Sequence, residues 1–336
     1  MKIPLSGMLP DEICTTLSLV KTYRGRQIFK AIYSGAKDIK SVTTLPSDMR
    51  LNFEEKYTLL GSFPEKVLKD DEGTGKMIII LSDKVKIECV LLTDGKGRKT
   101  ACISTQAGCA MGCLFCKTGE SGFFRNLSSS EITEQFIHLT AQFGHISNIV
   151  FMGMGEPLDN IENLFKAAEV LSHQDGAGMS PKKMTVSTCG IADKIKFMAD
   201  NGPPLRLALS LNASVQAKRE KIMPIAKKYP LSELKKALIH YQEKRGKRIT
   251  LEYVLIKGFN TGRDDAEAVE SFVKGLSAIV NLIPWNPAPR LDFETPSDSE
   301  TARFCRYLDA LNINYALRRE KGRTIKGACG QLASQQ

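Results

Sequence analysis

Four cysteines lie between residues 102 and 116, in the stretch CISTQAGCAMGCLFC, and three of them have the spacing C-x3-C-x2-C. These are Cys109, Cys113 and Cys116, and the glycines of the same stretch leave the backbone free to wrap three thiolates around one centre. Thiolates select zinc or iron–sulfur clusters. A closed zinc site requires a fourth ligand, and this neighbourhood offers only Cys102 and no histidine. The spacing favours a cluster with one open iron and leaves zinc and unbound thiols as alternatives.

Further residues able to bind a ligand come directly after short apolar segments. Each of these segments is rich in β-branched residues and is followed by an amphipathic helical pattern. The residues are Gly155 and Glu156 after ISNIVFMG, Ser187 in KMTVST, Ser210 and Asn212 in LRLALSLN, and Asn286 after IVNLIPW. In a parallel α/β barrel the loops that follow the strands meet at one face. We therefore expect these side chains to converge with the cysteine loop.

The elements that must position these residues form six strand and helix units in succession from about residue 98. The strand segments are TACIST, ISNIVFMG, KMTVST, LRLALSLN, RITLEYVLI and IVNLIPWN, and a helical pattern follows each of them. Such units require parallel strands joined by right-handed crossovers. The sequence therefore predicts an α/β fold with a partial (β/α)6 barrel rather than an open doubly wound sheet.

The first part of the chain has a different pattern. Segments with helical spacing come first, and the alternating segments GKMIIILSD and KVKIECVLL follow them. We expect a small helical unit and antiparallel strands over residues 1–94, the barrel over 95–315, and a basic tail over 316–336. The N-terminal region and the tail are candidate RNA-binding regions.

The chain is basic, with a formal net charge of +10 and a pI near 9.1. Such a charge favours a polyanionic partner, above all nucleic acid. The basic residues concentrate in the tail (Arg318, Arg319, Lys321, Arg323 and Lys326) and at Lys218, Arg219, Lys221, Lys227, Lys228 and 244–248. No apolar run approaches membrane-spanning length, and the N-terminus has no signal-peptide pattern. We expect a cytoplasmic protein without a membrane partner.

Beyond the cysteine loop, several strings resemble one branch of the radical S-adenosylmethionine (SAM) superfamily, the RlmN/Cfr family of RNA adenine methyltransferases. The strings are YRGRQIFKAIY, GFFRNLSSSEI, FMGMGEPLDN, MTVSTCG, LALSLNA, IMPIAKKYPL, NLIPWNP and ACGQL. They extend over almost the whole chain, and within the family the chain is most similar to the RlmN branch.

The resemblance implies the cofactors and their ligands. It places a [4Fe–4S] cluster on Cys109, Cys113 and Cys116, and SAM on the open iron. The implied SAM contacts are Gly155, Glu156, Ser187, Ser210, Leu211, Asn212 and Asn286. In the family an electron from the cluster cleaves SAM to a 5'-deoxyadenosyl radical, so a flavodoxin-like or ferredoxin-like electron donor is an implied partner.

The resemblance also implies a role for three residues outside the cofactor site. The family uses two SAM molecules per turnover, and by the match to ACGQL the first methylates Cys329, from which the second SAM's radical removes a hydrogen atom. Glu88 is the implied proton acceptor, although a glutamate in the alternating segment VKIECVLL would by itself be read as facing solvent. Cys102 is implied to resolve the covalent RNA adduct through a transient disulfide with Cys329.

The implied substrates are C2 of a specific adenosine in 23S rRNA and the adenosine 3' of the anticodon in tRNAs. Three alternatives stay open. The enzyme could methylate C8, as the Cfr branch does, or act on a protein or small molecule. The third alternative, of a different class, is a non-catalytic, zinc-stabilised RNA-binding protein.

Overall fold

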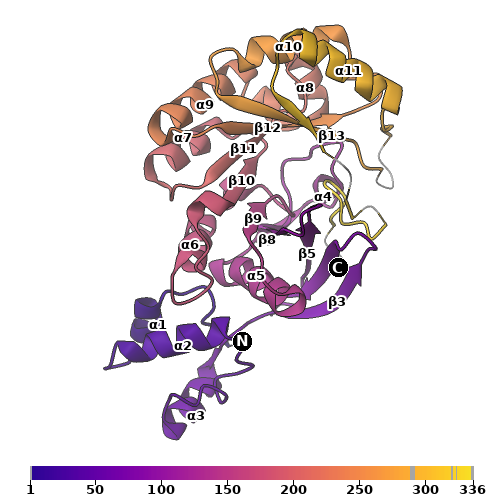
Figure 1. Ribbon diagram of the computed structural model, residues 1–336. Helices are drawn as coiled ribbons and strands as arrows, with labels where there is room; N and C mark the ends of the chain where they lie inside the picture. Colours follow the sequence, from indigo (N-terminus) through magenta and orange to yellow (C-terminus); the bar gives the residue numbers. More distant parts are fainter. Residues whose placement is uncertain (1, 288–291, 319–320, 323, 334–336) are drawn as a thin grey trace.

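The computed structural model describes residues 2–287, 292–318, 321–322 and 324–333, and is built around one long curved sheet (Figure 1). Within these residues the sheet has ten strands in the order β14-β13-β12-β11-β10-β9-β6-β5-β4-β3. From β6 to β14 every neighbouring pair is parallel. The parallel strands are β6 (Lys99–Cys102), β9 (Asn148–Phe151), β10 (Met184–Thr188), β11 (Arg206–Ser210), β12 (Ile249–Leu255), β13 (Ala278–Pro284) and β14 (Tyr315–Leu317).

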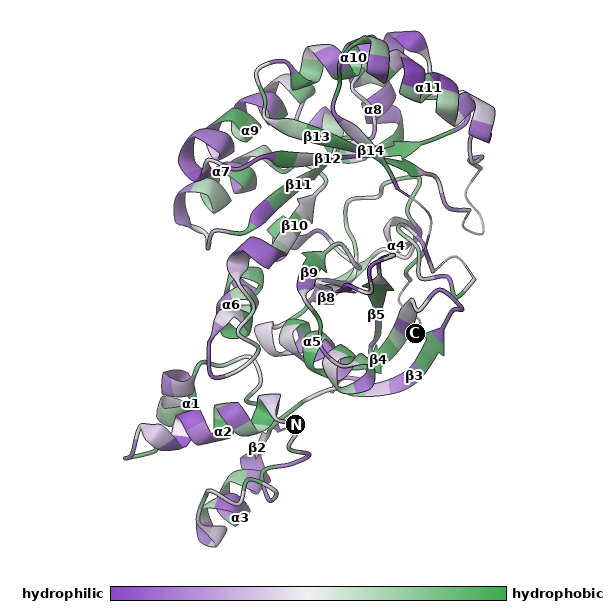
Figure 2. Cartoon of the chain, viewed as in Figure 1, coloured by the Kyte–Doolittle hydropathy of each residue, from purple (hydrophilic) through white to green (hydrophobic). Residues whose placement is uncertain are grey.

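The predicted partial (β/α) barrel is confirmed, and each of its six strands is followed by the expected helix. These helices are α5 (Ser129–Phe143), α6 (Ile161–Ser172), α7 (Ala192–Asn201), α9 (Leu231–Arg245), α10 (Arg263–Val273) and α11 (Asp298–Ala310). The helices lie outside the sheet, and hydrophobic residues colour the strands while polar residues mark the outer helix faces (Figure 2). The strand β14 was not predicted, because three residues are too few to show an alternating pattern.

Local signals fix where the helices begin and end. At the start of α5 the Ser128 side chain accepts a hydrogen bond from the Glu131 backbone, and the Glu131 carboxylate accepts one from the Ser128 backbone at 2.8 Å. This reciprocal pair is a capping box, and it explains why the SSSEI string starts a helix. At the C-terminal end of α9, Gly246 adopts a left-handed conformation with φ +59°. Glycine accepts this conformation without a steric penalty.

Three antiparallel strands extend the barrel sheet at its N-terminal edge. They are β3 (Phe63–Lys69), β4 (Gly75–Ile80) and β5 (Lys86–Thr93), and β5 joins them to β6. Met77, Ile79 and Ile87 are fully buried in the same hydrophobic core as the barrel strands. These strands therefore pack as part of the barrel and close one side of its interior.

The N-terminal helices form a separate unit that protrudes from the barrel (Figure 1). The unit comprises β1 (Ile3–Pro4), α1 (Pro10–Thr16), α2 (Tyr23–Tyr33), α3 (Ser47–Lys56) and β2 (Tyr57–Thr58). Its hydrophobic cluster around Ile28 and Phe29 also includes Ile137 of α5 and Val170 of α6. The buried carboxylate of Glu134 on α5 holds the segments that follow β1 and β2, because it accepts hydrogen bonds from Ser6 at 2.6 Å and from the Gly61 backbone at 2.8 Å.

In the tail, Arg319 and Arg323, which we counted among the RNA-binding candidates, lie outside the described residues. None of the helices in the described part of the chain has the length and apolar character needed to span a bilayer.

Candidate active site

The three cysteines of the C-x3-C-x2-C motif lie on a loop that protein backbone holds at several points. The loop connects β7 (Gln106–Gly108) to α4 (Lys117–Glu120), and β7 pairs with β8 (Phe123–Asn126) in a small sheet that was not predicted. The backbone amide of Cys109 donates to Gly122 at 2.8 Å, and that of Leu114 donates to Ile222 at 3.0 Å. The loop is therefore anchored on both sides before any cofactor binds.

The electrostatics of this loop suit a cofactor that stabilises thiolates. All three cysteines are half-buried. Burial raises the pKa of Cys109 to about 12. Burial is also the main cause that raises the pKa of Cys113, and the charges of Cys116 and Cys109 raise it further. These electrostatic effects indicate that the three thiols lie near one another, and an iron–sulfur cluster would stabilise them as thiolates.

A single metal ion fits the described residues less well. A zinc ion draws its thiolate ligands to about 2.3 Å, whereas a cluster places its own irons and sulfides between the thiolates. Among the described side chains, no group of three or more Cys, His, Asp or Glu is arranged to hold one metal ion. That part of the structure gives no support to the zinc alternative.

Glu156 lies beside the cysteine loop, at the turn after β9. Its carboxylate is buried and accepts hydrogen bonds from the backbone amides of Cys189 at 2.7 Å and Leu158 at 3.1 Å. Burial raises the pKa of Glu156, and its charge in turn raises the pKa values of Cys109 and Cys113. Glu156 thus presents a carboxylate next to the thiols of the cysteine motif.

Gly155 allows the chain to turn at this point. Its φ is +97°, and a Cβ atom there would come within 2.4 Å of the Gln106 Cβ. We did not predict Gln106 as a site residue. Its side-chain oxygen accepts a hydrogen bond from the Glu156 backbone amide at 2.8 Å. Close packing against Gln106 therefore requires glycine at 155.

Of the SAM contacts predicted at β10 and β11, the two serines are partly accessible, whereas Leu211 and Asn212 are buried in the loop after β11. The hydroxyl groups of Ser187 and Ser210 lie 3.5 Å apart at the ends of adjacent strands and are half-buried. Leu211 is fully buried. Asn212, with φ +57°, uses its side chain within the protein, since its Oδ1 accepts the Val254 backbone amide at 3.1 Å. The structure thus gives Asn212 a role in holding the loop after β11.

The C-terminal tail docks across the mouth of the barrel, over the cysteine loop. The backbone amide of Lys117 donates to Gly330 at 2.8 Å, and the Thr118 hydroxyl donates to Leu332 at 2.7 Å. From the opposite side, the Asn286 side chain donates to the backbone carbonyl of Cys329 at 3.2 Å. Residues far apart in the sequence therefore hold Cys329 between the end of β13 and the cysteine loop.

Two free thiols, those of Cys329 and Cys102, lie near each other at this mouth. Cys329 is exposed to solvent, yet burial is the largest cause that raises its pKa to about 11. Burial, and then the charge of Cys329, raise the pKa of Cys102 to about 12. All nine cysteines are free thiols, so these two are not joined.

Glu88 lies under the same tail and is buried, contrary to the surface position that its alternating segment would indicate. Its carboxylate forms an ion pair with Lys76 at 3.0 Å, and both side chains are less than 8% exposed. The other carboxylate oxygen accepts the backbone amide of Ala333 at 3.2 Å. The Lys76 ammonium group also donates to the Lys326 carbonyl at 3.3 Å. The tail therefore covers Glu88, and its backbone groups bond to both members of the Lys76–Glu88 ion pair.

Two charged residues of the interior were missed by sequence reasoning. Glu252, in the middle of β12, accepts a hydrogen bond from Asn281 at 3.2 Å, and its second oxygen is buried without a partner in the described residues. Burial raises the pKa of Glu252, and its charge acts on Cys329. Arg219, which we counted among the basic residues for RNA, is fully buried on α8 (Gln216–Ile222). That expectation is wrong for Arg219.

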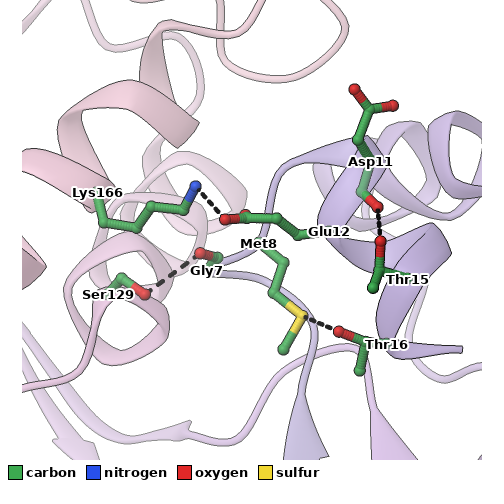
Figure 3. A pocket seen from close by; sticks show the side chains of 8 residues that line it. All are labelled: Gly7, Met8, Asp11, Glu12, Thr15, Thr16, Ser129 and Lys166. Atoms are coloured by element: carbon green, nitrogen blue, oxygen red, sulfur yellow. Dashed lines mark hydrogen bonds and ion pairs between the residues drawn. The ribbon is translucent and has the colours of Figure 1, made fainter.

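A cavity of about 530 Å³ lies elsewhere, between the N-terminal unit and the barrel (Figure 3). It is lined by Gly7, Met8, Asp11, Glu12, Thr15, Thr16, Ser129 and Lys166. Lys166 pairs with Glu12 at 2.6 Å, and Ser129 donates to the Gly7 carbonyl at 3.2 Å. These contacts connect the two units, and none of the predicted site residues lines the cavity.

Comparison of the sequence with those of known proteins points to one family. Residues 103–270 match the model of the Radical SAM superfamily. The chain is 46% identical over 333 residues to a protein of Treponema denticola named probable dual-specificity RNA methyltransferase RlmN, covering 99% of this chain and 96% of the relative. A protein of Moorella thermoacetica with the same name is 40% identical over 347 residues, covering 98% and 97%.

Comparison with solved structures leads to the same family. A radical SAM methyltransferase from Sphaerobacter thermophilus is 36% identical, with a TM-score of 0.94, covering 98% of this chain and 99% of that one. SuiB of Streptococcus suis bound to S-adenosylmethionine is 13% identical with a TM-score of 0.50, covering 66% and 50%. The likeness to SuiB shows the fold alone.

Proposed function

Because the chain belongs to the RlmN group of radical SAM RNA methyltransferases, we propose that it methylates C2 of adenine in structured RNA. The substrates that we propose are a specific adenosine of 23S rRNA and the adenosine 3' of the anticodon in tRNAs. The dual specificity in the relatives' names supports two classes of RNA. An enzyme acting on these RNAs works where they are, so we place it in the cytoplasm.

The enzyme uses a [4Fe–4S] cluster and SAM, as its family does. Our proposal assigns the cluster to Cys109, Cys113 and Cys116, which lie on one loop and act electrostatically on one another. SAM would lie against the end of β9 at Glu156 and at the paired hydroxyls of Ser187 and Ser210. Asn286 would complete this set, because its buried Oδ1 has no partner among the described residues.

When bound, the two cofactors supply first a methyl group for Cys329 and then the radical that removes a hydrogen atom from that methyl group. The protein supplies the orientation and the proton transfers. Asn286 and the cysteine loop hold Cys329 at the mouth of the barrel, where the adenine must reach it. Once the methylene carbon has bonded to C2, the adduct would return its unpaired electron to the cluster, and Glu88 accepts the C2 proton. The Cys102 thiolate then attacks the Cys329 sulfur and forms a disulfide. The electron pair of the broken carbon–sulfur bond stays on the methylene carbon, which takes up a proton and becomes the methyl group.

The observation that supports this proposal is that the docked tail carries Cys329 close to Cys102 and bonds to Glu88 through the Ala333 amide, although these residues come from separate segments. RNA has to present an unstacked adenine to reach them. We propose that the N-terminal helical unit and the basic tail grip the RNA phosphates. A flavodoxin-like or ferredoxin-like protein would supply the electron.

The test is nucleoside mass spectrometry of 23S rRNA fragments and tRNA after anaerobic reaction with the reconstituted enzyme. We expect 2-methyladenosine in both RNAs. Formation of 8-methyladenosine would indicate the Cfr-type reaction instead. If SAM is cleaved and neither RNA is methylated, the proposed substrate class is wrong.

A further inference from the structure

Arg219 is a buried cation without an anionic partner in the described structure. Its side chain is 0% exposed. Its Nε donates to the Leu211 carbonyl at 3.1 Å, and its Nη2 donates to the carbonyls of Cys189 at 2.6 Å and Ser210 at 3.2 Å. Its Nη1 is buried and has no hydrogen-bond partner among the residues that the structure describes.

This arrangement is costly unless an anion is bound nearby. An arginine side chain does not deprotonate in proteins, and burial of an unpaired charge is strongly unfavourable. The three carbonyl groups fix the guanidinium in place but supply only partial negative charge. None of the ion pairs between described residues involves Arg219. The guanidinium therefore has no carboxylate in direct contact among the described residues, although the buried Glu156 carboxylate binds the amide of the same Cys189.

The helix that carries Arg219 contacts the cysteine loop. Arg219 is on α8, and the carbonyl of Ile222 at the end of this helix accepts the backbone amide of Leu114, which lies between two of the cysteines. A Cβ atom placed on Gly112 of the same loop would lie 3.8 Å from the Pro224 side chain. The helix and the loop are therefore one packed unit.

We propose that Arg219 is the counter-charge of the iron–sulfur cluster and makes the cluster easier to reduce. A cluster gains one negative charge when it accepts an electron, so a fixed cation beside it stabilises the reduced form. Arg219 is in this sense a positioning residue that acts through the cluster. The inference rests on the cofactor of the family and not on which RNA atom the enzyme methylates.

A second anion could use the same cation, because SAM carries a carboxylate and Arg219 bonds to the carbonyls of Ser210 and Leu211. The two sources can be separated by measuring the cluster without SAM. A cation that serves the cluster changes its reduction in the absence of SAM. A cation that serves only the carboxylate changes SAM affinity and leaves the SAM-free cluster unaltered.

The experiment is an anaerobic redox titration of the reconstituted enzyme without SAM, followed by electron paramagnetic resonance of the reduced cluster. We expect Arg219→Gln to make one-electron reduction at least about tenfold less favourable, a shift of about 59 mV to more negative potential. Arg219→Lys keeps the charge and should stay within about threefold of the wild type. Lys221→Gln removes an exposed charge of the same helix and controls for a general effect of charge.

Three outcomes would overturn the proposal. The first is an unchanged potential in Arg219→Gln with a full cluster. The second is an equal shift in Arg219→Lys and Arg219→Gln, since the lost carbonyl bonds rather than the charge would then be responsible. The third is an effect on SAM binding alone. If Arg219→Gln assembles no cluster, iron retention against a chelator decides: Arg219→Lys should retain the cluster, and its loss there would also overturn the proposal.

Discussion

The side-chain amide of Asn286 donates a hydrogen bond to the backbone carbonyl of Cys329, with 3.2 Å between Nδ2 and the oxygen. The other end of the same amide, Oδ1, is buried and has no partner among the described residues. One residue therefore holds the proposed methyl carrier and has an acceptor to offer to SAM. Tail position and cofactor binding should be linked through it.

Asn286→Ala should loosen the tail and weaken SAM binding together. The loss of one hydrogen bond is worth about 1 kcal/mol, or roughly fivefold in an equilibrium constant. Hydrogen exchange of the tail peptides and SAM titration measure the two effects. Gln331→Ala is the matched control, because Gln331 ties the tail to the Pro287 carbonyl at 2.8 Å and is not a proposed SAM contact. An equal loss of SAM affinity in both variants would contradict a direct contact at Asn286.

Cys329→Ala should abolish RNA methylation and leave iron content unchanged, because Cys329 is proposed to carry the methyl group and not to bind the cluster. Iron analysis and methyl transfer from labelled SAM measure the two properties. Cys305→Ala replaces a half-buried thiol of α11 and should retain activity. Methylation by Cys329→Ala at the wild-type rate would exclude the methyl-carrier role.

Cys102→Ala should trap a covalent complex between enzyme and RNA. The carbon–sulfur bond to Cys329 is broken by attack of the Cys102 thiolate, and alanine has no group for that attack. The complex should appear as a slowly migrating band on a denaturing gel and disappear on RNase treatment. Free methylated RNA without a trapped band would show that another group resolves the adduct.

Lys76→Met should destabilise the protein strongly, because it leaves the buried Glu88 carboxylate without its cation. Breaking a buried ion pair in this way costs about 3–5 kcal/mol. The double variant Lys76→Met with Glu88→Gln removes both charges and should recover most of that loss. Urea unfolding at neutral pH measures the difference. Equal stability of the two variants would mean that the pair is solvated, contrary to its burial.

Glu252→Gln should stabilise the protein at neutral pH. Burial raises the pKa of Glu252 in the folded state, so the carboxylate costs stability above that pKa, and each unit of the shift is worth about 1.4 kcal/mol. The gain should shrink as the pH falls through the folded pKa, because the native wild type then carries a neutral carboxyl group. Urea unfolding across this pH range measures the gain in stability. Glu267→Gln, at an exposed glutamate, is the control. A gain that is the same at every pH would contradict the burial argument.

The order of the elements and the identity of the chemical residues could be predicted from the sequence alone. Alternating and helical periods are local properties, so the six strand and helix units are visible without coordinates. Because parallel strands end at one face, Gly155, Glu156, Ser187 and Asn286 could be placed on a common side. The cysteine spacing likewise indicates its chemistry locally.

What the sequence could not decide was which charges are buried. Glu88 lies in an alternating segment and Arg219 lies among lysines, so both resemble surface residues until other segments cover them. Arg219 is buried because carbonyl groups from two separate strand ends accept its hydrogen bonds. Glu88 is buried because β4 supplies Lys76 and the tail supplies the Ala333 amide. Burial depends on long-range packing, and only the tertiary structure brings those distant groups together.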